Sequence, residues 1–446
     1  MRRALIVLLF GFALAPFIVR AESLASQLEA AQKDQDLHAE IEITRRILDQ
    51  EPTNAGLKES LIRLWLRAGD FDLAEQTLLL WPEAPASLKA TTTAAVLWQR
   101  ENQNAAREVL AKYLANHPQD LEATSQLASF YQNDPGKVRA LLTESPLTGE
   151  SQLLLLQRAA AEKLLGDYPA ALADFDRAKS LDSEAPAIRD VRPSFERLAA
   201  ALPSLQAAEA ALHKDPRDFR ALLQRAYFSL SADLAREQVH ADAETARQIN
   251  PDSTAVLLLL AKTSSQPSTH IITEYGVDPA IALPEPGQFE KLITLDTEVH
   301  SRPTATSSRL ARASLLGEAP PQYRLALRDA GTVLEKDPSN SEAGLAAVYA
   351  ASRLNDLPTA REWLARLSAS RPPAKLLAQA RFYLSEAELA GDNLDAALQL
   401  INEAVKADTK ASYLKQRAAI LIRLNRQAEA EADLAKASAL EKRSKR

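Results

Sequence analysis

Residues that could carry out chemistry are few in this chain of 446 amino acids, and they do not gather at one place. The densest set is Asp296, Glu298 and His300, which alternate with other residues. On a β-strand the three side chains would share one face, as the ligands of a metal ion do, whereas on a helix they point in different directions. The surrounding sequence favours a helix, so we predict no metal site here.

Other catalytic signatures are missing from the sequence. It contains no phosphate-binding glycine loop, no Gly-x-Ser-x-Gly and no His-Glu-x-x-His, and its six histidines are scattered. There is no cysteine, which excludes disulfides, thiolate metal sites and a lipid-bearing N-terminal cysteine. We therefore predict a protein that is not an enzyme and has no catalytic residues, cofactor or metal.

A repeated pattern dominates the chain instead. Residues 166–183 read GDYPAALADFDRAKSLDS, and similar segments recur about every 34 residues. In this copy Gly166 supplies a turn between two helices, while Ala171, Phe175 and Ala178 form the apolar stripe of the second helix. Such a helical hairpin has small residues where its two helices cross closely. The period predicts an all-α array of stacked hairpins.

The pattern resembles the tetratricopeptide repeat family, whose consensus has Gly or Asn at the turn, then Ala, an aromatic residue, Ala and a closing Pro. Pairs such as Glu51-Pro52 and Asp337-Pro338 close individual repeats. The resemblance extends over about 400 residues and implies a right-handed superhelical solenoid of about 12 helix pairs. The structural repeat positions that carry it are Gly69, Ala74, Ala106, Gly166, Tyr168, Ala171, Phe175, Ala178, Ala360, Ala397, Ala404 and Ala430.

The N-terminal residues predict export. Residues 1–21 contain two initial arginines, an apolar run and a small-residue cleavage site, which are the features of a secretory signal peptide. The alternative is a retained anchor, but the run is short for a membrane span and contains Gly11 and Pro16. We expect an exported bacterial member of the family that has no transmembrane span after cleavage. Its expected location is periplasmic, with an extracellular location as the alternative.

The charge of the chain bears on its partners. The formal net charge is −6, and loss of residues 1–21 removes three arginines and no acidic residue, which gives −9. An acidic protein is a poor match for nucleic acid or for anionic lipid. We therefore expect no nucleic acid partner, and residues 441–446 form only a short basic tail.

One repeat departs from the regular spacing. A first helix is predicted from residue 254 to 262, but its partner helix begins only near residue 288. The intervening segment 264–286 is rich in proline and glycine, which predicts a loop insertion. It separates a first part of the array, 22–263, from a second part, 287–440.

Two finer expectations concern irregular segments. Residues 269–275 inside the insertion have a β-prone composition and are able to pair with a partner strand, whereas the alternative is a surface loop or spacer without a binding role. Pro193 lies where the first helix of another repeat should run, which predicts a bent or broken helix there.

In the tetratricopeptide repeat family, ligands lie in a concave groove lined by the first helix of each pair, and this implies a binding function. The positions that correspond to this groove, together with a tyrosine of the insertion, give as partner-binding candidates Arg63, Arg67, Trp98, Phe228, Tyr275, Tyr349 and Arg353. Aromatic side chains contribute much of the energy of protein interfaces. We infer a non-catalytic scaffold or adaptor of the bacterial cell envelope or secretion machinery, which binds a protein or peptide in the groove or through 264–286. The alternative is an accessory protein for polysaccharide or cell-wall assembly or export that binds carbohydrate.

Overall fold

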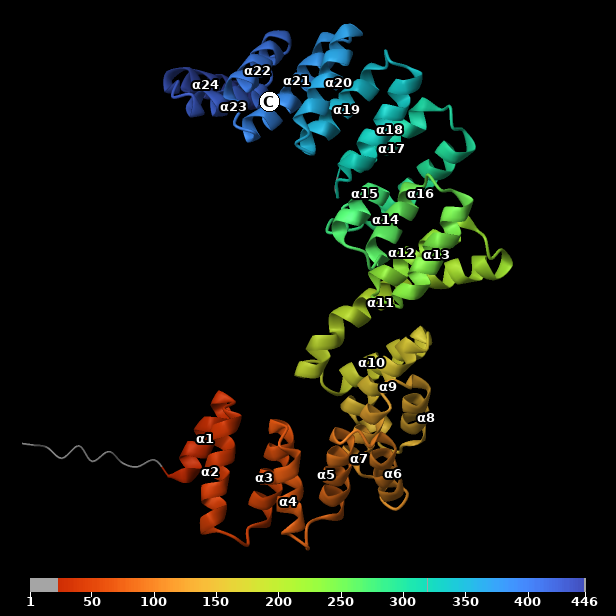
Figure 1. The fold of residues 1–446 in the computed structure, drawn as a ribbon, viewed down its shortest axis with the longest axis vertical. Helices are drawn as coiled ribbons and strands as arrows, with labels where there is room; N and C mark the ends of the chain where they lie inside the picture. Colours follow the sequence, from red (N-terminus) through yellow and green to blue (C-terminus); the bar gives the residue numbers. More distant parts are fainter. Residues whose placement is uncertain (1–22, 319, 445–446) are drawn as a thin grey trace, which may run out of the picture. The chain divides into compact units, whose positions relative to one another are not determined.

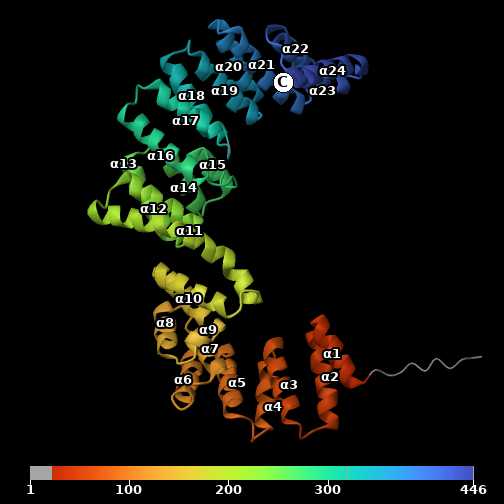
Figure 2. The same cartoon turned by 180° about the vertical axis from the view of Figure 1, so that it is seen from behind.

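Helices make up all the regular structure of the described chain (Figures 1 and 2). The computed structural model describes residues 23–318 and 320–444, which form 24 α-helices and one short 3-10 helix at Thr148–Glu150, without a strand. The predicted signal peptide at 1–21 and the last two residues of the basic tail lie outside the described residues. None of the described helices is both long and apolar enough to cross a membrane.

The chain divides into two compact units between Arg192 and Pro193. The helices that lie wholly in the first unit are α1 (Leu24–Asp34), α2 (Leu37–Gln50), α3 (Ala55–Ala68), α4 (Phe71–Leu79), α5 (Ala86–Gln99), α6 (Gln103–Leu114), α7 (Leu121–Phe130), α8 (Pro135–Glu144), α9 (Gln152–Leu164) and α10 (Tyr168–Leu181). The boundary falls inside α11 (Pro186–Lys214). The helices of the second unit are α12 (Phe219–Ser231), α13 (Arg236–Ile249), α14 (Thr254–Thr263), α15 (Ser268–Tyr275), α16 (Pro286–Ser301), α17 (Thr306–Gly317), α18 (Tyr323–Lys336), α19 (Ser341–Arg353), α20 (Leu357–Ala369), α21 (Ala374–Ala390), α22 (Leu394–Ala407), α23 (Ala411–Arg423) and α24 (Gln427–Ser444).

Successive helices pack against each other in pairs, which confirms the predicted all-α array of hairpins. The described chain holds eleven pairs: α1/α2, α3/α4, α5/α6, α7/α8, α9/α10, α12/α13, α14/α16, α17/α18, α19/α20, α21/α22 and α23/α24. The first helix of a pair also contacts the first helix of the next pair, as in α3, α5, α7 and α9 and in α17, α19, α21 and α23. We call the surface that these first helices form in each unit the first-helix layer.

The hairpin α9/α10 shows how the repeat sequence produces this structure. Gly166 ends α9 with φ +81°, a left-handed conformation that glycine adopts without strain. The side chain of Asp167 then accepts a hydrogen bond from the amide of Ala170 and caps the start of α10. Ala171 and Ala178 are fully buried, so the helices approach each other without a large side chain between them.

The other structural repeat positions also lie at helix crossings and turns. Gly69 has φ +81° at the end of α3, and Tyr168 is half-buried at the start of α10. The small or aromatic residues of the remaining positions are buried, with at most 3% of their surface exposed: Ala74, Ala106, Phe175, Ala360, Ala397, Ala404 and Ala430.

Four hairpins of the described chain contain the same ion pair, which we call the Arg–Asp clamp. An arginine of the first helix donates two hydrogen bonds to an aspartate of the second helix, with N–O distances from 2.5 to 2.8 Å. The pairs are Arg158–Asp174, Arg225–Asp242, Arg312–Asp329 and Arg417–Asp433. Two parallel hydrogen bonds fix both the distance and the orientation of the two side chains. The clamp therefore sets how the two helices of a hairpin lie against each other.

The predicted bent or broken helix at Pro193 is not broken, because α11 continues through this residue. It runs without interruption for 29 residues with Pro193 and Pro203 inside it. Each proline removes one backbone hydrogen bond, at a cost of about 3 kcal/mol. Both prolines are exposed, while a single stripe of buried side chains continues through the helix at Ile188, Phe195, Leu198, Ala201, Leu205, Ala208 and Leu212. The burial of this stripe offsets the cost of the prolines.

The insertion also differs from its prediction, because it contains a helix. Segment 264–286 was expected to be a loop with a β-prone stretch at 269–275, but α15 spans Ser268–Tyr275. Pro267 stands at the N-cap of α15, and Gly276 ends the helix with φ +68°. Proline and glycine thus mark the ends of a helix here, and the burial of Ile271 overrides the β-propensity of its neighbours.

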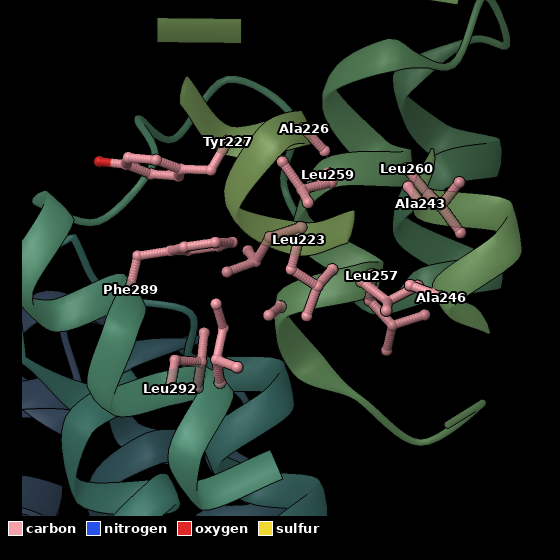
Figure 3. Close-up of a cluster of buried hydrophobic side chains, with 14 of the residues drawn as sticks. Leu223, Ala226, Tyr227, Ala243, Ala246, Leu257, Leu259, Leu260, Phe289 and Leu292 are labelled. Carbon is pink, nitrogen blue, oxygen red and sulfur yellow. The ribbon is translucent and has the colours of Figure 1, made fainter. Parts of the chain in front are cut away.

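The character of α14 explains why this hairpin needs extra chain. Residues 254–261 of α14 are all buried, so this helix is apolar on every side and must be covered on every side. Helix α15 packs against it, and Phe289 and Leu292 of α16 meet its leucines in the core shown in Figure 3. The insertion is therefore part of the core of the second unit.

Candidate binding site

In the first unit, the predicted arginines already have partners within the chain. Arg63 of α3 donates to Glu59 (Nη2–Oε1 2.9 Å) and to Glu122 of α7 (Nη2–Oε2 2.8 Å). The hydrogen bonds of Glu122 raise the pKa of Arg63 further above its usual range. Arg67 lies 3.4 Å from Glu40 of α2. These arginines link helices of the first unit.

Trp98 of α5 is likewise occupied by contacts between repeats. Its ring stacks on Phe130 of α7 with 4.2 Å between the centroids, and the guanidinium of Arg107 lies 5.3 Å from the ring centre. The indole has therefore one face against a phenyl ring and one cation nearby.

In the second unit, Phe228 and Tyr275 lie at different places. Phe228 of α12 packs edge-on against Tyr227, with 5.2 Å between the ring centres. Tyr275 is the last residue of α15, and Arg247 lies 5.8 Å from its ring centre. Burial raises the pKa of Tyr275. Neither residue contributes to the pocket described below.

The structure does bring Tyr349 and Arg353 together on α19. The guanidinium carbon of Arg353 lies 5.3 Å from the ring centre of Tyr349, and its Nη2 lies 3.2 Å from Oε2 of Glu386 on α21. Burial raises the pKa of Glu386. The pair therefore belongs to the first-helix layer and links two of its helices.

Tyr349 is one member of a row of aromatic rings that the sequence analysis did not identify. The centroids are 5.8 Å apart for Tyr323 and Tyr349, 4.7 Å for Tyr349 and Tyr383, 5.7 Å for Tyr383 and Phe382, and 4.9 Å for Phe382 and Tyr413. Tyr349 and Tyr383 stand one repeat length apart on α19 and α21. This spacing was a usable signal, because residues one period apart occupy equivalent positions on neighbouring first helices.

A pocket of about 350 Å³ opens beside this row, between α17, α19 and α21. We call it the tyrosine pocket, and its lining includes Ser314, Gly317, Glu318, Glu342, Tyr349, Gln379 and Tyr383. Gly317 lets the tyrosine approach, since a Cβ atom at this position would lie 3.3 Å from Cε1 of Tyr349. The hydroxyl of Tyr349 donates to the carbonyl of Gly317 at 3.4 Å, and Nε2 of Gln379 donates to the hydroxyl of Tyr383 at 2.7 Å.

A second pocket of about 620 Å³ adjoins the first one. It is lined by α16 and α17 together with Arg220 of α12, includes Lys291, and shares Ser314 and Glu318 with the tyrosine pocket. We call it the flanking pocket. Together the two pockets provide hollowed surface over several hairpins of the second unit, which suits an elongated ligand.

The acidic set considered for metal binding has a structural role instead. Asp296 accepts hydrogen bonds from Ser253 (Oγ–Oδ2 2.6 Å), Thr254 (Oγ1–Oδ1 2.8 Å) and Arg312 (Nη1–Oδ1 2.8 Å). Glu298 accepts a hydrogen bond from Ser308. Across the part of the chain that the structure describes, no three His, Cys, Asp or Glu side chains are grouped as metal ligands.

The comparisons with known proteins give structural resemblances alone. No family model matches the chain, and no curated protein matches it. The crystal structure of yeast Tom70 is similar at 16% identity and a TM-score of 0.29, over 79% of this chain and 85% of that one. The Cut9–Hcn1 hetero-tetramer of the APC/C is similar at 12% identity and a TM-score of 0.30, over 94% of this chain and 93% of that one. A tetratricopeptide repeat protein from Parabacteroides merdae is similar at 13% identity and a TM-score of 0.28, over 65% of this chain and 93% of that one. At these TM-scores the resemblances carry no conclusion about family or function.

Proposed function

We propose that this chain is a non-catalytic scaffold that binds a protein or peptide partner along the first-helix layer of its second unit. The observation that supports this most directly is the tyrosine pocket with its adjoining flanking pocket. Half-buried tyrosines provide large contact area with little rotamer entropy to lose, which suits them to interfaces. The array of hairpins presents these surfaces side by side, as an extended partner requires.

The groove formed by the tyrosine pocket and the flanking pocket is a better candidate for partner recognition than the insertion at 264–286. Ile271 and Val277 of the insertion are buried, and its backbone is held by two side chains of neighbouring helices. Nζ of Lys262 donates to the carbonyl of Pro279 at 2.6 Å, and the hydroxyl of Tyr227 donates to that of Pro284 at 2.7 Å. A segment tied down in this way stabilises the core and has little freedom to wrap around a partner.

The proposal extends to location and class of complex. The features of residues 1–21 favour export, so the partner would belong to the cell envelope or to the secretion machinery of a bacterium. The acidic charge of the chain, −6, argues against nucleic acid as the ligand. Localisation of the full-length chain by fractionation, with mass spectrometry of its N-terminus, tests export and cleavage directly.

A site-specific photocrosslink tests the binding site itself. A photoreactive residue placed at Ser314 lies in the lining of both pockets, and one placed at Gln399 lies exposed on α22, outside either pocket. We expect a defined protein adduct in cells from Ser314 and none from Gln399. Adducts from both positions, or from neither, would contradict binding in this groove.

A carbohydrate ligand is the second candidate, because tyrosine faces are also able to stack on sugar rings. The row of rings that includes Tyr349 and Tyr383 is the observation in its favour. A glycan array probed with the mature chain tests it. Binding of a polysaccharide that is lost in Tyr383→Ala, with no protein adduct at Ser314, would replace the scaffold proposal by this one.

A further inference from the structure

The tyrosine pocket carries negative charge without a compensating positive charge. Glu318 and Glu342 are its charged lining residues, and no arginine, lysine or histidine lines it. Both glutamates are exposed, and among the described residues neither carboxylate has a salt bridge. A ligand group that enters this pocket therefore meets two carboxylates whose electrostatic attraction is not yet used inside the chain.

The rings of the pocket are suited to a cation as well. Ring faces of tyrosine attract positive charge, and Arg353 already lies over Tyr349 at 5.3 Å from the ring centre. The charge of Arg353 is balanced by Glu386 at 3.2 Å, and Arg353 itself does not line the pocket. The charge of Arg353 therefore does not neutralise Glu318 and Glu342, which remain able to attract a cationic ligand.

The hydrogen-bonding groups add direction. The hydroxyl of Tyr383 accepts a hydrogen bond from Nε2 of Gln379 at 2.7 Å, which orients this ring and leaves the carbonyl oxygen of Gln379 as an acceptor for a ligand. The volume of about 350 Å³ lies at the small end of the range for ligand pockets, so it suits one long side chain better than a folded element.

We propose that the tyrosine pocket binds a lysine or arginine side chain of the partner. This side chain would contact the rings of Tyr349 and Tyr383 and the carboxylates of Glu318 and Glu342. This inference rests on the proposed scaffold function and specifies the chemistry of its ligand. The neighbouring residues of the partner segment would lie in the flanking pocket, which shares Glu318 and Ser314.

Peptide libraries with one fixed position test this proposal. The probes are five fluorescent decapeptide pools that carry Lys, Arg, norleucine, citrulline or Glu at a central position and mixed residues elsewhere. Norleucine and citrulline keep the length of the basic side chains and remove their charge. We expect the mature chain to bind the Lys and Arg pools at least about tenfold more tightly than the other three pools, measured by fluorescence anisotropy, with a preference that weakens as salt is added.

Paired variants decide whether the pocket is responsible. The double variant Glu318→Gln, Glu342→Gln should lose the preference for basic pools. The control double variant Glu362→Gln, Glu431→Gln removes the same amount of charge from exposed positions of α20 and α24. It should keep the preference for basic pools. Circular dichroism checks that both variants fold.

Several results would overturn the inference. These are a preference for neutral or acidic pools, a basic preference that survives in Glu318→Gln, Glu342→Gln, and an absence of binding to every pool. The scaffold proposal would still stand in each case if the photocrosslink from Ser314 forms, so the two failures are distinguishable.

Discussion

Single side chains of this molecule divide into charges that hold helices together and charges that remain available at the surface. Arg312 belongs to the first group, since it is 1% exposed and binds both Asp296 and Asp329. Glu318 and Glu342 belong to the second group. The same residue types therefore have different consequences when they are changed, and two predictions follow from the buried ones.

Arg312→Met should destabilise the second unit strongly. The change leaves Asp296 buried without an ion-pair partner and leaves Asp329 only Arg309, whose Nη1 lies 3.5 Å from Oδ1. Breaking a buried ion pair in this way costs about 3–5 kcal/mol. Arg426→Met, which removes an exposed pair with Glu429, should cost much less, because solvent screens an ion pair at the surface. Urea unfolding followed by the fluorescence of Trp363 in the second unit measures both. Similar small losses for the two variants would show that the buried arginine is not needed to balance these carboxylates.

Glu162 should make the stability of the first unit depend on pH. Burial, together with the nearby charge of Asp174, raises its pKa from 4.5 to about 7. Between these two values the folded state binds more protons than the unfolded state, so the free energy of unfolding falls as pH rises, and the penalty is complete above pH 7. Glu162→Gln should therefore stabilise the first unit at pH 8 by about 1–2 kcal/mol, after allowance for solvent screening, and by less at pH 5.

Urea unfolding followed by Trp65, Trp81 and Trp98, all in the first unit, provides the measurement. Glu108→Gln, on an exposed face of α6, is the matched control and should change little at either pH. An equal effect of Glu162→Gln at pH 5 and pH 8 would contradict the raised pKa.

At this scale, sequence reasoning found the repeat positions and missed the residues that define the pocket. Ala171 and Gly166 recur with the period, so their positions could be read from the sequence. The pairing of Arg158 with Asp174 also recurs in other copies and could have been found from the spacing. Glu318 and Glu342 could not, because they line one pocket from two different hairpins and neither follows the repeat pattern.

The elements show how tertiary packing decides between competing local preferences. In α11, two prolines favour a break, but the buried stripe from Ile188 to Leu212 is continuous and the helix persists. In α15, Thr and Ile favour a strand, but α14 is apolar on every side and requires a cover, and the segment is helical. Local sequence alone does not predict the unbroken α11 or the helix α15, since neither the stripe nor the need for a cover is a local property.

Pro203→Ala should stabilise α11 by about 1–3 kcal/mol. Alanine restores the backbone N–H that proline lacks, and the exposed position needs no repacking. Gln206→Ala, at another exposed position of α11, should change the stability by less than about 0.5 kcal/mol. Differential scanning calorimetry of the full chain measures both. A loss of stability in Pro203→Ala would indicate that the proline shapes the helix in a way its neighbours depend on.

The molecule as a whole is an array in which most contacts join neighbours along the chain. Damage to one hairpin should therefore remain near it, because stability in such arrays is a sum of local terms. Ala171→Asp buries an unpaired charge where Ala171 is fully buried, at a cost of about 3–5 kcal/mol. Ala173→Asp, at an exposed position of the same helix, is the control.

Hydrogen exchange along the chain reads out the extent of the damage. We expect loss of protection in α9, α10 and the adjacent hairpin in Ala171→Asp, and unchanged protection in α19 to α24. A uniform loss of protection over the whole chain would show that the array unfolds as one cooperative body and would contradict the one-dimensional description.

The Arg–Asp clamp has a consequence for how such a chain grows by duplication. Each clamp joins two residues of one hairpin, such as Arg417 and Asp433, so a copied or deleted hairpin takes both charges with it. Gain or loss of a whole hairpin then leaves no buried ion without its partner. The hairpin α17/α18 is different, because its Arg312 also binds Asp296 of the preceding α16. This hairpin cannot be removed alone without leaving Asp296 buried and unpaired, which ties it to the hairpin α14/α16 that precedes it.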